Sequence, residues 1–284
     1  MSITKLKEKR KENIDESSVK HFGREWSRFR QDKYQEDLEG LAENYFKIFP
    51  WEILSYKSVG FDMGCGSGRW AIYVSSKVKK LICIDPSEEA IKVAKKNLKN
   101  KENCSLALGS ANSNNLKDNS MDFGYSLGVL HHLPDTLSAL ENCSRKLKKG
   151  APFLIYLYYR FDNRGLVFRL IWRLSDFMRL IIRLLPFPIK RSVTDLLALL
   201  IYLPLARISL LLEKLGIKSS FIPLSFYKNL PFYAMRTDSL DRFGTPMEHR
   251  FTKQEIKDMM EKADFSKVTF MDEEPYWVCV GYKN

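Results

Sequence analysis

Residues 62–68 read DMGCGSG, so three glycines stand at every second position directly after an acid. Glycines allow a backbone to approach a ligand closely. A dinucleotide-binding loop has the different spacing GxGxxG, in which the third glycine lies inside the following helix. The carboxylate of Asp62 would repel a pyrophosphate and attract a cationic amino group. The pattern favours the binding of a ligand with an amino group. Alternatively, the glycines only form a tight turn between a strand and a helix.

A second acid, Asp85, ends the apolar segment 81–84 and lies about twenty residues beyond the glycines, the separation at which an acid binds a ribose in related folds. Its carboxylate could accept hydrogen bonds from both ribose hydroxyls. Since the carboxyl ends of parallel strands meet at one sheet edge, we expect Asp85 beside the glycine run.

The chain has four histidines, and three of them are candidates for moving a proton. His131 and His132 follow the apolar segment 121–126, at the same expected sheet edge. His249 lies further on, in the segment GTPMEHRFT. Imidazole suits proton removal near neutral pH. Alternatively, these histidines belong to a structural turn and have no catalytic role.

Three arginines downstream could bind an anionic group of a substrate: Arg236, Arg242 and Arg250. Guanidinium groups bind carboxylates and phosphates with two parallel hydrogen bonds. Alternatively, these arginines are exposed to solvent and bind no substrate.

The candidate binding and catalytic residues can act together only if the fold brings them to one place. Short apolar segments alternate with helical patterns, which predicts a mostly parallel sheet covered on both faces. Thr252 and Glu255 predict a capping box that begins a late helix. The last two segments predict an antiparallel pair at the sheet edge. The expected strands are residues 57–63, 81–84, 104–108, 121–126, 153–158, 268–271 and 277–282.

The net charge of +12 is concentrated in two segments. Residues 1–33 carry ten basic and six acidic side chains, and residues 160–220 carry eleven and four among many Leu, Ile and Phe. In residues 164–185 charged side chains recur every three or four positions, which predicts a helix with one face that carries four arginines and an aspartate; these residues are Arg169, Arg173, Asp176, Arg179 and Arg183. A second, more apolar helix is expected over 192–212, with a break near Pro204.

Two interpretations of this basic and apolar insert stay open. In one, the two helices form a soluble hairpin over the substrate pocket and bury their apolar faces against each other. In the other, the apolar residues enter the acyl boundary of a membrane while the arginines bind anionic headgroups. Nucleic acid is less favoured, because the arginines alternate with aliphatic residues instead of exposed aromatic ones.

Composition limits the expected cellular location of the protein and the kinds of site it contains. No apolar run approaches the ~20 residues of a transmembrane helix, and the N-terminus lacks the apolar core of a secretory signal. The five cysteines are widely spaced and form no CxxC pair, which argues against a disulfide framework or a zinc site. We therefore expect a cytoplasmic protein that needs no metal.

The sequence resembles the class I S-adenosylmethionine-dependent methyltransferases, in particular the type 11 group that includes quinone-biosynthesis enzymes. The resemblance covers residues 57–160 and returns at 250–284. It rests on FDMGCGSG, Asp85, DNSMDFGYSLGVLHHLPD (118–135) and RKLKKGAPFLIY (145–156). With the strand pattern it implies a Rossmann-like doubly wound α/β sheet, mostly parallel with an antiparallel C-terminal edge, and a helical insert after the fifth strand.

The resemblance also implies contacts with S-adenosylmethionine. The glycine turn would hold the methionine part, the strand-end acid the ribose, a residue pair after the next strand the adenine, and the end of the fourth strand would lie beside the sulfonium. The cofactor-binding residues so expected are Asp62, Gly64, Cys65, Gly66, Gly68, Asp85, Pro86, Ser110, Ala111, Ser126 and Leu127. Two positions depart from the family, which often has an acid at Ser110 and usually a glycine at Asp264.

The segment HFGREW, residues 21–26, is similar to a segment that precedes this fold in some bacterial relatives. We expect it to form a lid in which Trp26 covers the cofactor, or else an arm that Trp26 anchors on the surface. The chain then divides into an N-terminal arm and lid (1–56), a cofactor-binding core (57–160), a helical insert (161–250) and a closing helix with two strands (251–284).

These observations together predict a methyltransferase that acts on a small or lipid-linked acceptor. Methylation of oxygen is favoured, on a surface-glycan sugar or a hydrophobic metabolite. Two alternatives from other classes stay open: an RNA-modifying methyltransferase, and a non-catalytic cofactor-binding interaction protein.

Overall fold

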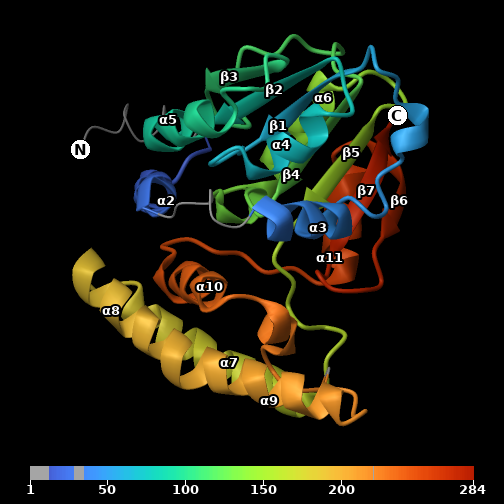
Figure 1. The fold of residues 1–284 in the computed structure, drawn as a ribbon. Coiled ribbons are helices and arrows are strands. Elements are labelled where there is room, and N and C mark those ends of the chain that lie inside the picture. The colour runs from blue at the N-terminus through green and yellow to red at the C-terminus, as the bar shows by residue number, and fades with distance from the viewer. Residues whose placement is uncertain (1–12, 29–34, 220) are drawn as a thin grey trace. The chain divides into compact units, whose positions relative to one another are not determined.

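The structure is a computed structural model that describes residues 13–28, 35–219 and 221–284. It has two units, of which the first comprises the described residues up to Arg160 together with Met247–Asn284 (Figure 1). The second unit is Phe161–Pro246. The four-segment division expected from the sequence stays a prediction.

Seven strands form a single sheet in the first unit: β1 (Val59–Met63), β2 (Lys80–Asp85), β3 (Cys104–Leu108), β4 (Phe123–Leu127), β5 (Pro152–Tyr156), β6 (Phe265–Phe270) and β7 (Val278–Lys283). Their order is β3-β2-β1-β4-β5-β7-β6. The first five strands are parallel, and β7 runs antiparallel to both β5 and β6. The predicted fold is confirmed, including the position of the insert after the fifth strand.

Helices cover both faces of this sheet. They are α2 (Glu16–Arg28), α3 (Gln35–Tyr45), α4 (Arg69–Ser75), α5 (Glu88–Asn97), α6 (Thr136–Lys146) and α11 (Lys253–Lys262), with short 3₁₀ turns η1 (Trp51–Ile53) and η2 (Leu130–His132). One core contains residues of α6 and α11, and the other contains residues of α3, α4 and α5. The capping box predicted at Thr252 and Glu255 begins α11.

Two glycines allow β1 and β4 to pair closely. Gly60 lies opposite Phe123, and Phe61 lies opposite Gly124. A Cβ atom at Gly60 would stand 2.3 Å from the Phe123 ring, and one at Gly124 would stand 2.5 Å from the Phe61 ring. Each glycine therefore makes room for the aromatic side chain of its neighbour, which keeps the two strands that end at the candidate site in register.

The second unit is entirely helical in its regular structure. Its elements are α7 (Leu166–Ile182), α8 (Phe187–Leu197), the π-helical turn η3 (Ala198–Tyr202), α9 (Leu203–Lys214), η4 (Ser225–Asn229) and α10 (Phe232–Gly244). The helix from Phe187 to Lys214 is continuous, so the break expected near Pro204 is absent from it. The wider π turn just before Pro204 accommodates the proline, which lacks an N–H and crowds the preceding turn.

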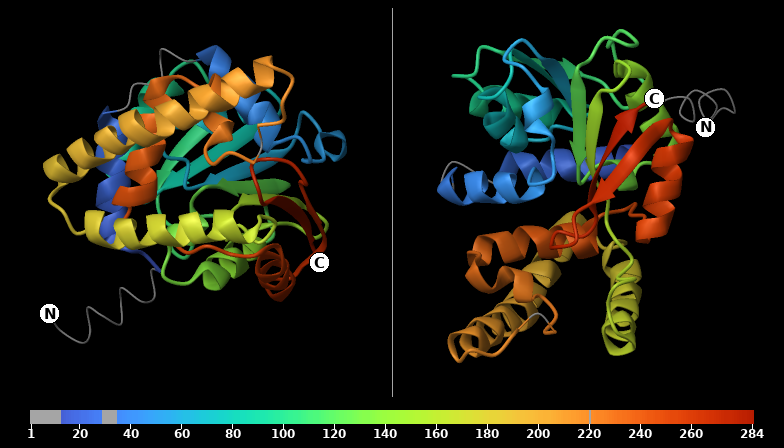
Figure 2. Two further views of the ribbon diagram at one scale, coloured as in Figure 1. Left: turned by 90° about the horizontal axis from the view of Figure 1, so that it is seen from below. Right: turned by 90° about the vertical axis from the view of Figure 1, so that its right-hand side faces the viewer.

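Of the two interpretations left open for the insert, the hairpin is wrong in one respect: its two helices do not bury their apolar faces against each other. α7 and α8 each pack against α10, and the small core of this unit draws on all three helices. Figure 1 and the right-hand view of Figure 2 show α7 and the helix Phe187–Lys214 on the same side of α10. Because α10 provides the packing surface, the apolar faces of the two helices are not buried against each other.

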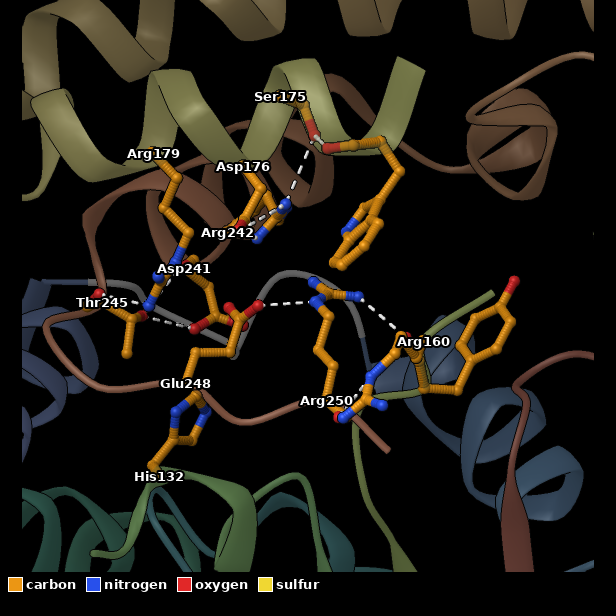
Figure 3. Close-up of polar contacts among 12 residues, drawn as sticks. His132, Arg160, Ser175, Asp176, Arg179, Asp241, Arg242, Thr245, Glu248 and Arg250 are labelled. Carbon is orange, nitrogen blue, oxygen red and sulfur yellow. Dashed lines mark hydrogen bonds and ion pairs between the residues drawn. The ribbon is translucent and has the colours of Figure 1, made fainter. Parts of the chain in front are cut away.

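Cations of the second unit cover the C-terminal end of α10. The last carbonyls of a helix lack intrahelical donors and carry partial negative charge, so basic side chains are favourable there. Figure 3 shows Arg179 extending from α7 to Thr245. The three contacts are Arg179 Nη2 to Thr245 O at 3.0 Å, Lys190 Nζ to Gly244 O at 3.0 Å, and Arg183 Nη1 to Pro246 O at 3.2 Å.

This contact makes a prediction for stability. Replacing Arg179, which is buried, with alanine removes a charged hydrogen bond and should lower the free energy of unfolding by about 2 to 3 kcal/mol. The matched control Arg173→Ala lies on the exposed part of the same helix and should change it by less than about 0.5 kcal/mol. Urea unfolding followed by circular dichroism measures both. Equal losses in the two variants would contradict the structural role of Arg179.

Candidate active site

The glycine run forms the turn from β1 to α4. Gly64, Gly66 and Gly68 have φ angles of +81°, +53° and +78°, a region that other residues rarely adopt. The amides of Gly64 and Cys65 both donate to the Ile84 carbonyl, at 2.8 and 2.9 Å, which ties the turn to β2. Only glycine suits these three positions, so the spacing noted in the sequence follows from backbone geometry.

Asp85 lies at the end of β2 and connects two elements. Its Oδ2 accepts a hydrogen bond from the Gly66 amide at 2.9 Å, and its Oδ1 accepts one from the Ser87 amide at 2.9 Å. The side chain is buried, and this burial raises the pKa of the Asp85 carboxyl to about 6. Each oxygen keeps a further lone pair that can accept from a ligand hydroxyl. Pro86 follows directly and leads into α5.

Asp62 is a buried acid within β1. The Tyr125 hydroxyl donates to its Oδ2 at 3.0 Å, whereas Oδ1 has no hydrogen-bond partner among the described residues. Burial raises the pKa of the Asp62 carboxyl to about 8, so the group is mostly protonated at neutral pH. A cationic amino group beside Oδ1 would satisfy this oxygen and stabilise the carboxylate.

The turns after β3 and β4 bring the other expected cofactor residues to the same edge. Ser110 Oγ accepts from the Ser113 amide at 3.0 Å and so closes its turn, in which Ala111 is buried. Ser126 Oγ donates to the Met63 carbonyl at 2.8 Å, which fixes β4 against the end of β1. Buried Leu127 ends β4. The individual cofactor contacts of these residues stay predictions.

The two adjacent histidines lie in η2, directly after β4. His131 is fully buried and stacks on Tyr158 with ring centroids 3.9 Å apart. Burial, with nearby positive groups, holds the pKa of His131 well below its usual value, so its ring is neutral. His132 Nδ1 lies 2.7 Å from the Met247 carbonyl, which can only accept, so Nδ1 carries the proton. With the proton on Nδ1, Nε2 is the acceptor nitrogen of the neutral tautomer.

The chain returns to this edge through residues 247–251. The His249 amide donates to the His131 carbonyl at 2.9 Å, and the Phe251 amide donates to the Tyr158 carbonyl at 2.9 Å. Arg250 is thereby held with its guanidinium 5.1 Å from the Tyr158 ring centroid, and its Nε donates to Glu248 at 2.6 Å (Figure 3). The His249 side chain is exposed.

The structure thus brings Arg250 together with His131 and His132, although more than a hundred residues separate them in the sequence. The other two arginines lie in α10 of the second unit and have acidic partners there. Arg236 forms two hydrogen bonds to Asp195, at 2.9 and 2.6 Å, and Arg242 Nη2 lies 3.3 Å from Asp176. These ion pairs hold α10 to α8 and α7, and a role in acceptor binding stays a prediction for both.

Helix α2 connects the glycine turn with the histidines. A Cβ atom at Gly66 would lie 3.0 Å from Trp26 Nε1, so the indole packs directly on the turn. Phe22, one helical turn earlier, lies 4.7 Å from the His132 ring. Figure 1 shows α2 beside α5, with which it makes many contacts. Whether this helix opens as a lid stays a prediction.

Sequence reasoning missed several residues of this edge. Asn13 accepts from the Asp135 amide at 2.8 Å and donates to the Asp135 carbonyl at 2.7 Å, which fastens the start of α2 to the turn before α6. Phe22 and Tyr158 contact the histidines. A lone asparagine and two aromatic side chains carry no motif, so their roles follow only from the tertiary contacts.

Residues 61–155 match the model of a family described as a methyltransferase domain. These residues belong to the methyltransferase domain family. The chain therefore contains a class I S-adenosylmethionine-dependent methyltransferase domain of the type 11 group, as the resemblance indicated, and its cofactor is S-adenosylmethionine.

A demethylmenaquinone methyltransferase of Staphylococcus aureus is 37% identical over 93 residues. That match covers 31% of this chain and 38% of the relative, so the likeness is confined to the domain. Two solved structures share the fold. A candidate methyltransferase of Haloferax volcanii, in complex with the Trm112 methyltransferase activator, is 13% identical over 92% of this chain and 96% of its own, with a TM-score of 0.52. A candidate O-methyltransferase of Nostoc punctiforme is 14% identical over 91% and 60%, with a TM-score of 0.50.

The residues of the methyltransferase domain fit this cofactor. The partnerless Oδ1 of buried Asp62 suits its amino group, and the turn of three positive-φ glycines suits a closely approaching ligand. The carboxylate of Asp85 at the end of β2 suits the ribose hydroxyls. Among the described residues, no cluster of His, Cys, Asp or Glu could hold a metal ion.

Cofactor binding should therefore depend on the turn. Gly66→Val places a branched side chain in a positive-φ position against Trp26, and Asp85→Ala removes the acceptor at the end of β2. Both variants should abolish binding of S-adenosylmethionine in calorimetry. The control Gly165→Val lies in the second unit, where a Cβ meets nothing within 4 Å, and should bind normally. Unimpaired binding in both site variants would refute this assignment.

The raised pKa of Asp62 predicts how stability depends on pH. Between the unfolded pKa of about 4 and the folded pKa of about 8, the folded protein carries one more proton at this site, so stability falls as pH rises. The slope reaches at most about 1.4 kcal/mol per pH unit. Relative to Asp62→Asn, wild-type protein should lose free energy of unfolding from pH 5 to pH 8.

Urea unfolding at several pH values measures this difference. The exposed carboxylate Asp272 supplies the control, because Asp272→Asn should follow the wild-type curve. Parallel curves for wild type and Asp62→Asn would show that Asp62 is not the protonated group.

Proposed function

We propose that this chain is an active methyltransferase that transfers the methyl group of S-adenosylmethionine to a small or lipid-linked acceptor. The observation that carries the proposal is the geometry of His132, whose Nδ1 lies 2.7 Å from the Met247 carbonyl, so that Nε2 is the acceptor nitrogen of the neutral tautomer. This nitrogen belongs to a buried turn directly after β4, at the edge where the cofactor residues gather.

When bound, S-adenosylmethionine supplies a methyl group on its sulfonium, activated for in-line displacement. The chain has to orient the acceptor, exclude water and remove a proton. We assign proton removal from an acceptor hydroxyl to His132 Nε2. Trp26 and Phe22 of α2 cover the edge and limit access of water. Neutral, buried His131 and Tyr158 form the apolar wall beside it.

Arg250 acts in this proposal as a positioning residue. Its guanidinium is paired with Glu248 and lies over the Tyr158 ring, so it holds the wall next to His131. The pKa of Arg250 is raised, because the Glu248 carboxylate outweighs the cost of burial. Direct binding of an anionic acceptor by Arg250, and a catalytic role for exposed His249, stay predictions.

The acceptor class is also part of the proposal. The relative in Staphylococcus aureus is a demethylmenaquinone methyltransferase, which supports a hydrophobic acceptor for the shared domain. We favour oxygen as the methylated atom, since a histidine base is most useful where a hydroxyl must lose its proton. A surface-glycan sugar carried on a lipid would fit both features, in an enzyme that faces the cytoplasm.

The test is transfer of labelled methyl from S-adenosylmethionine into cell extracts separated into lipids, small polar molecules and RNA. Label should enter the lipid or small-molecule fraction. His132→Phe should lower the rate about 100-fold or more with unchanged cofactor affinity in calorimetry, because it removes only the base. The control Lys257→Gln alters an exposed residue of α11 and should retain full activity.

Other outcomes separate the alternatives. Label in the RNA fraction would favour an RNA-modifying methyltransferase. Cofactor binding without formation of S-adenosylhomocysteine in any fraction would favour a non-catalytic cofactor-binding protein and would overturn the proposal.

A further inference from the structure

Helix α7 turns Arg179 inward, whereas most of its large apolar side chains, together with Arg169 and Arg173, are exposed. Arg179 is 4% exposed and bonded to the end of α10, whereas Leu166, Leu174 and Phe177 are 77%, 62% and 64% exposed. Figure 3 shows Arg179 and Asp176 of α7 directed toward α10 residues. A surface helix of a globular protein has the opposite arrangement, with its apolar stripe toward the core.

The helix Phe187–Lys214 has the same outward apolar face. Its inner side packs through residues at helical spacing, most of them small, and its outer side exposes branched aliphatic residues. The buried residues are Lys190, Thr194, Ala198, Tyr202, Ala206 and Ser209. The exposed ones are Ile189, Leu196, Leu199, Leu200, Ile201, Ile208 and Leu211.

These faces are concentrated in one part of the chain. Among the described residues, all but three of the large hydrophobic side chains that are exposed lie between 166 and 221; the exceptions are Ile53, Tyr56 and Leu108. Apolar patches of such extent mark binding surfaces. In Figure 1 both α7 and the helix Phe187–Lys214 lie below α10. Because both pack against α10, their exposed side chains lie on the parts of each helix that α10 does not cover.

Exposed cations accompany this apolar surface. Arg169 and Arg173 flank the apolar arc of α7, and Arg207, Lys214 and Lys218 lie on or just after α9. The segment 160–220 has eleven basic against four acidic side chains. Exposed leucines bordered by cations match the boundary between acyl chains and anionic headgroups.

We propose that the outward faces of α7 and of the helix Phe187–Lys214 bind an anionic lipid bilayer, with both helices lying in the plane of the membrane surface. By length and composition alone, Phe187–Lys214 could also cross a membrane, and its most apolar 18-residue window has a mean hydropathy of 2.0. Crossing would separate it from α10 and break the hydrogen bond from Ser239 to the Thr194 carbonyl and the Arg236–Asp195 ion pair. The in-plane position retains these contacts.

This inference rests on the proposed function and extends it, because binding to a bilayer would hold the enzyme where lipid-linked acceptors occur. Binding to lipid requires neither cofactor nor turnover. A failure to bind vesicles is therefore distinguishable from a failure to transfer methyl groups.

The experiment is flotation of the full chain with vesicles of phosphatidylcholine, with or without phosphatidylglycerol. Wild-type protein should float with the anionic vesicles. Leu170→Glu combined with Phe177→Glu should lower partitioning at least about 100-fold, because two exposed apolar side chains that would enter the bilayer are exchanged for charges. The matched control combines Ile53→Glu with Tyr56→Glu. These two exposed apolar residues lie outside the proposed membrane-binding surface, so this variant should float as wild type does.

A variant that removes two positive charges separates the electrostatic contribution to vesicle binding from the apolar contribution. Arg169→Gln combined with Arg173→Gln should weaken binding to phosphatidylglycerol vesicles about 30-fold, at about 1 kcal/mol for each cation. Unchanged circular dichroism and cofactor affinity verify the fold of every variant. The proposal is overturned if wild-type protein stays soluble with both vesicle types, or if the apolar-face and control variants float equally. A dimer in light scattering that Phe177→Glu dissociates, without vesicle binding, would instead assign this face to a second copy of the chain.

Discussion

The carboxylate of Asp85 accepts hydrogen bonds from the amides of Gly66 and Ser87, so one buried acid fixes both the glycine turn after β1 and the start of α5. The turn is further tied to β2 by the Ile84 carbonyl. With its backbone fixed in a conformation that favours glycine, the turn can receive Trp26 of α2 against Gly66. The covered edge of the sheet therefore depends on how this acid joins two neighbouring strands.

Chain segments from three parts of the sequence complete the edge. Helix α2 covers it from the N-terminal side, η2 supplies the histidines, and residues 247–251 return after the second unit. The return is what fixes the tautomer of His132, because the Met247 carbonyl accepts its Nδ1 proton. The orientation of the His132 ring therefore depends on a segment that follows the helical insertion.

The second unit reverses the usual placement of charge and apolar surface. Its inward cations interact with the carbonyls at the end of α10, where the helix dipole and unsatisfied acceptors compensate for burial. With Arg179 of α7 turned toward these carbonyls, Phe177 and most leucines of this helix face outward beside the exposed Arg169 and Arg173. The net charge of +12, which seemed a global property, therefore has two roles here: holding α10 and bordering an apolar surface.

Local patterns in the sequence determined the strands, the cofactor turn and the position of the insert, because glycine spacing, strand-end acids and alternating periodicity each act over a few residues. They did not determine the partner of Arg250, the contact of Asn13 with Asp135, or the orientation of α7. The arginine periodicity of α7 indicates an amphipathic helix but carries no information on which face is turned inward. That choice depended on α10, whose C-terminal carbonyls lie some seventy residues away in the sequence and become neighbours only after folding.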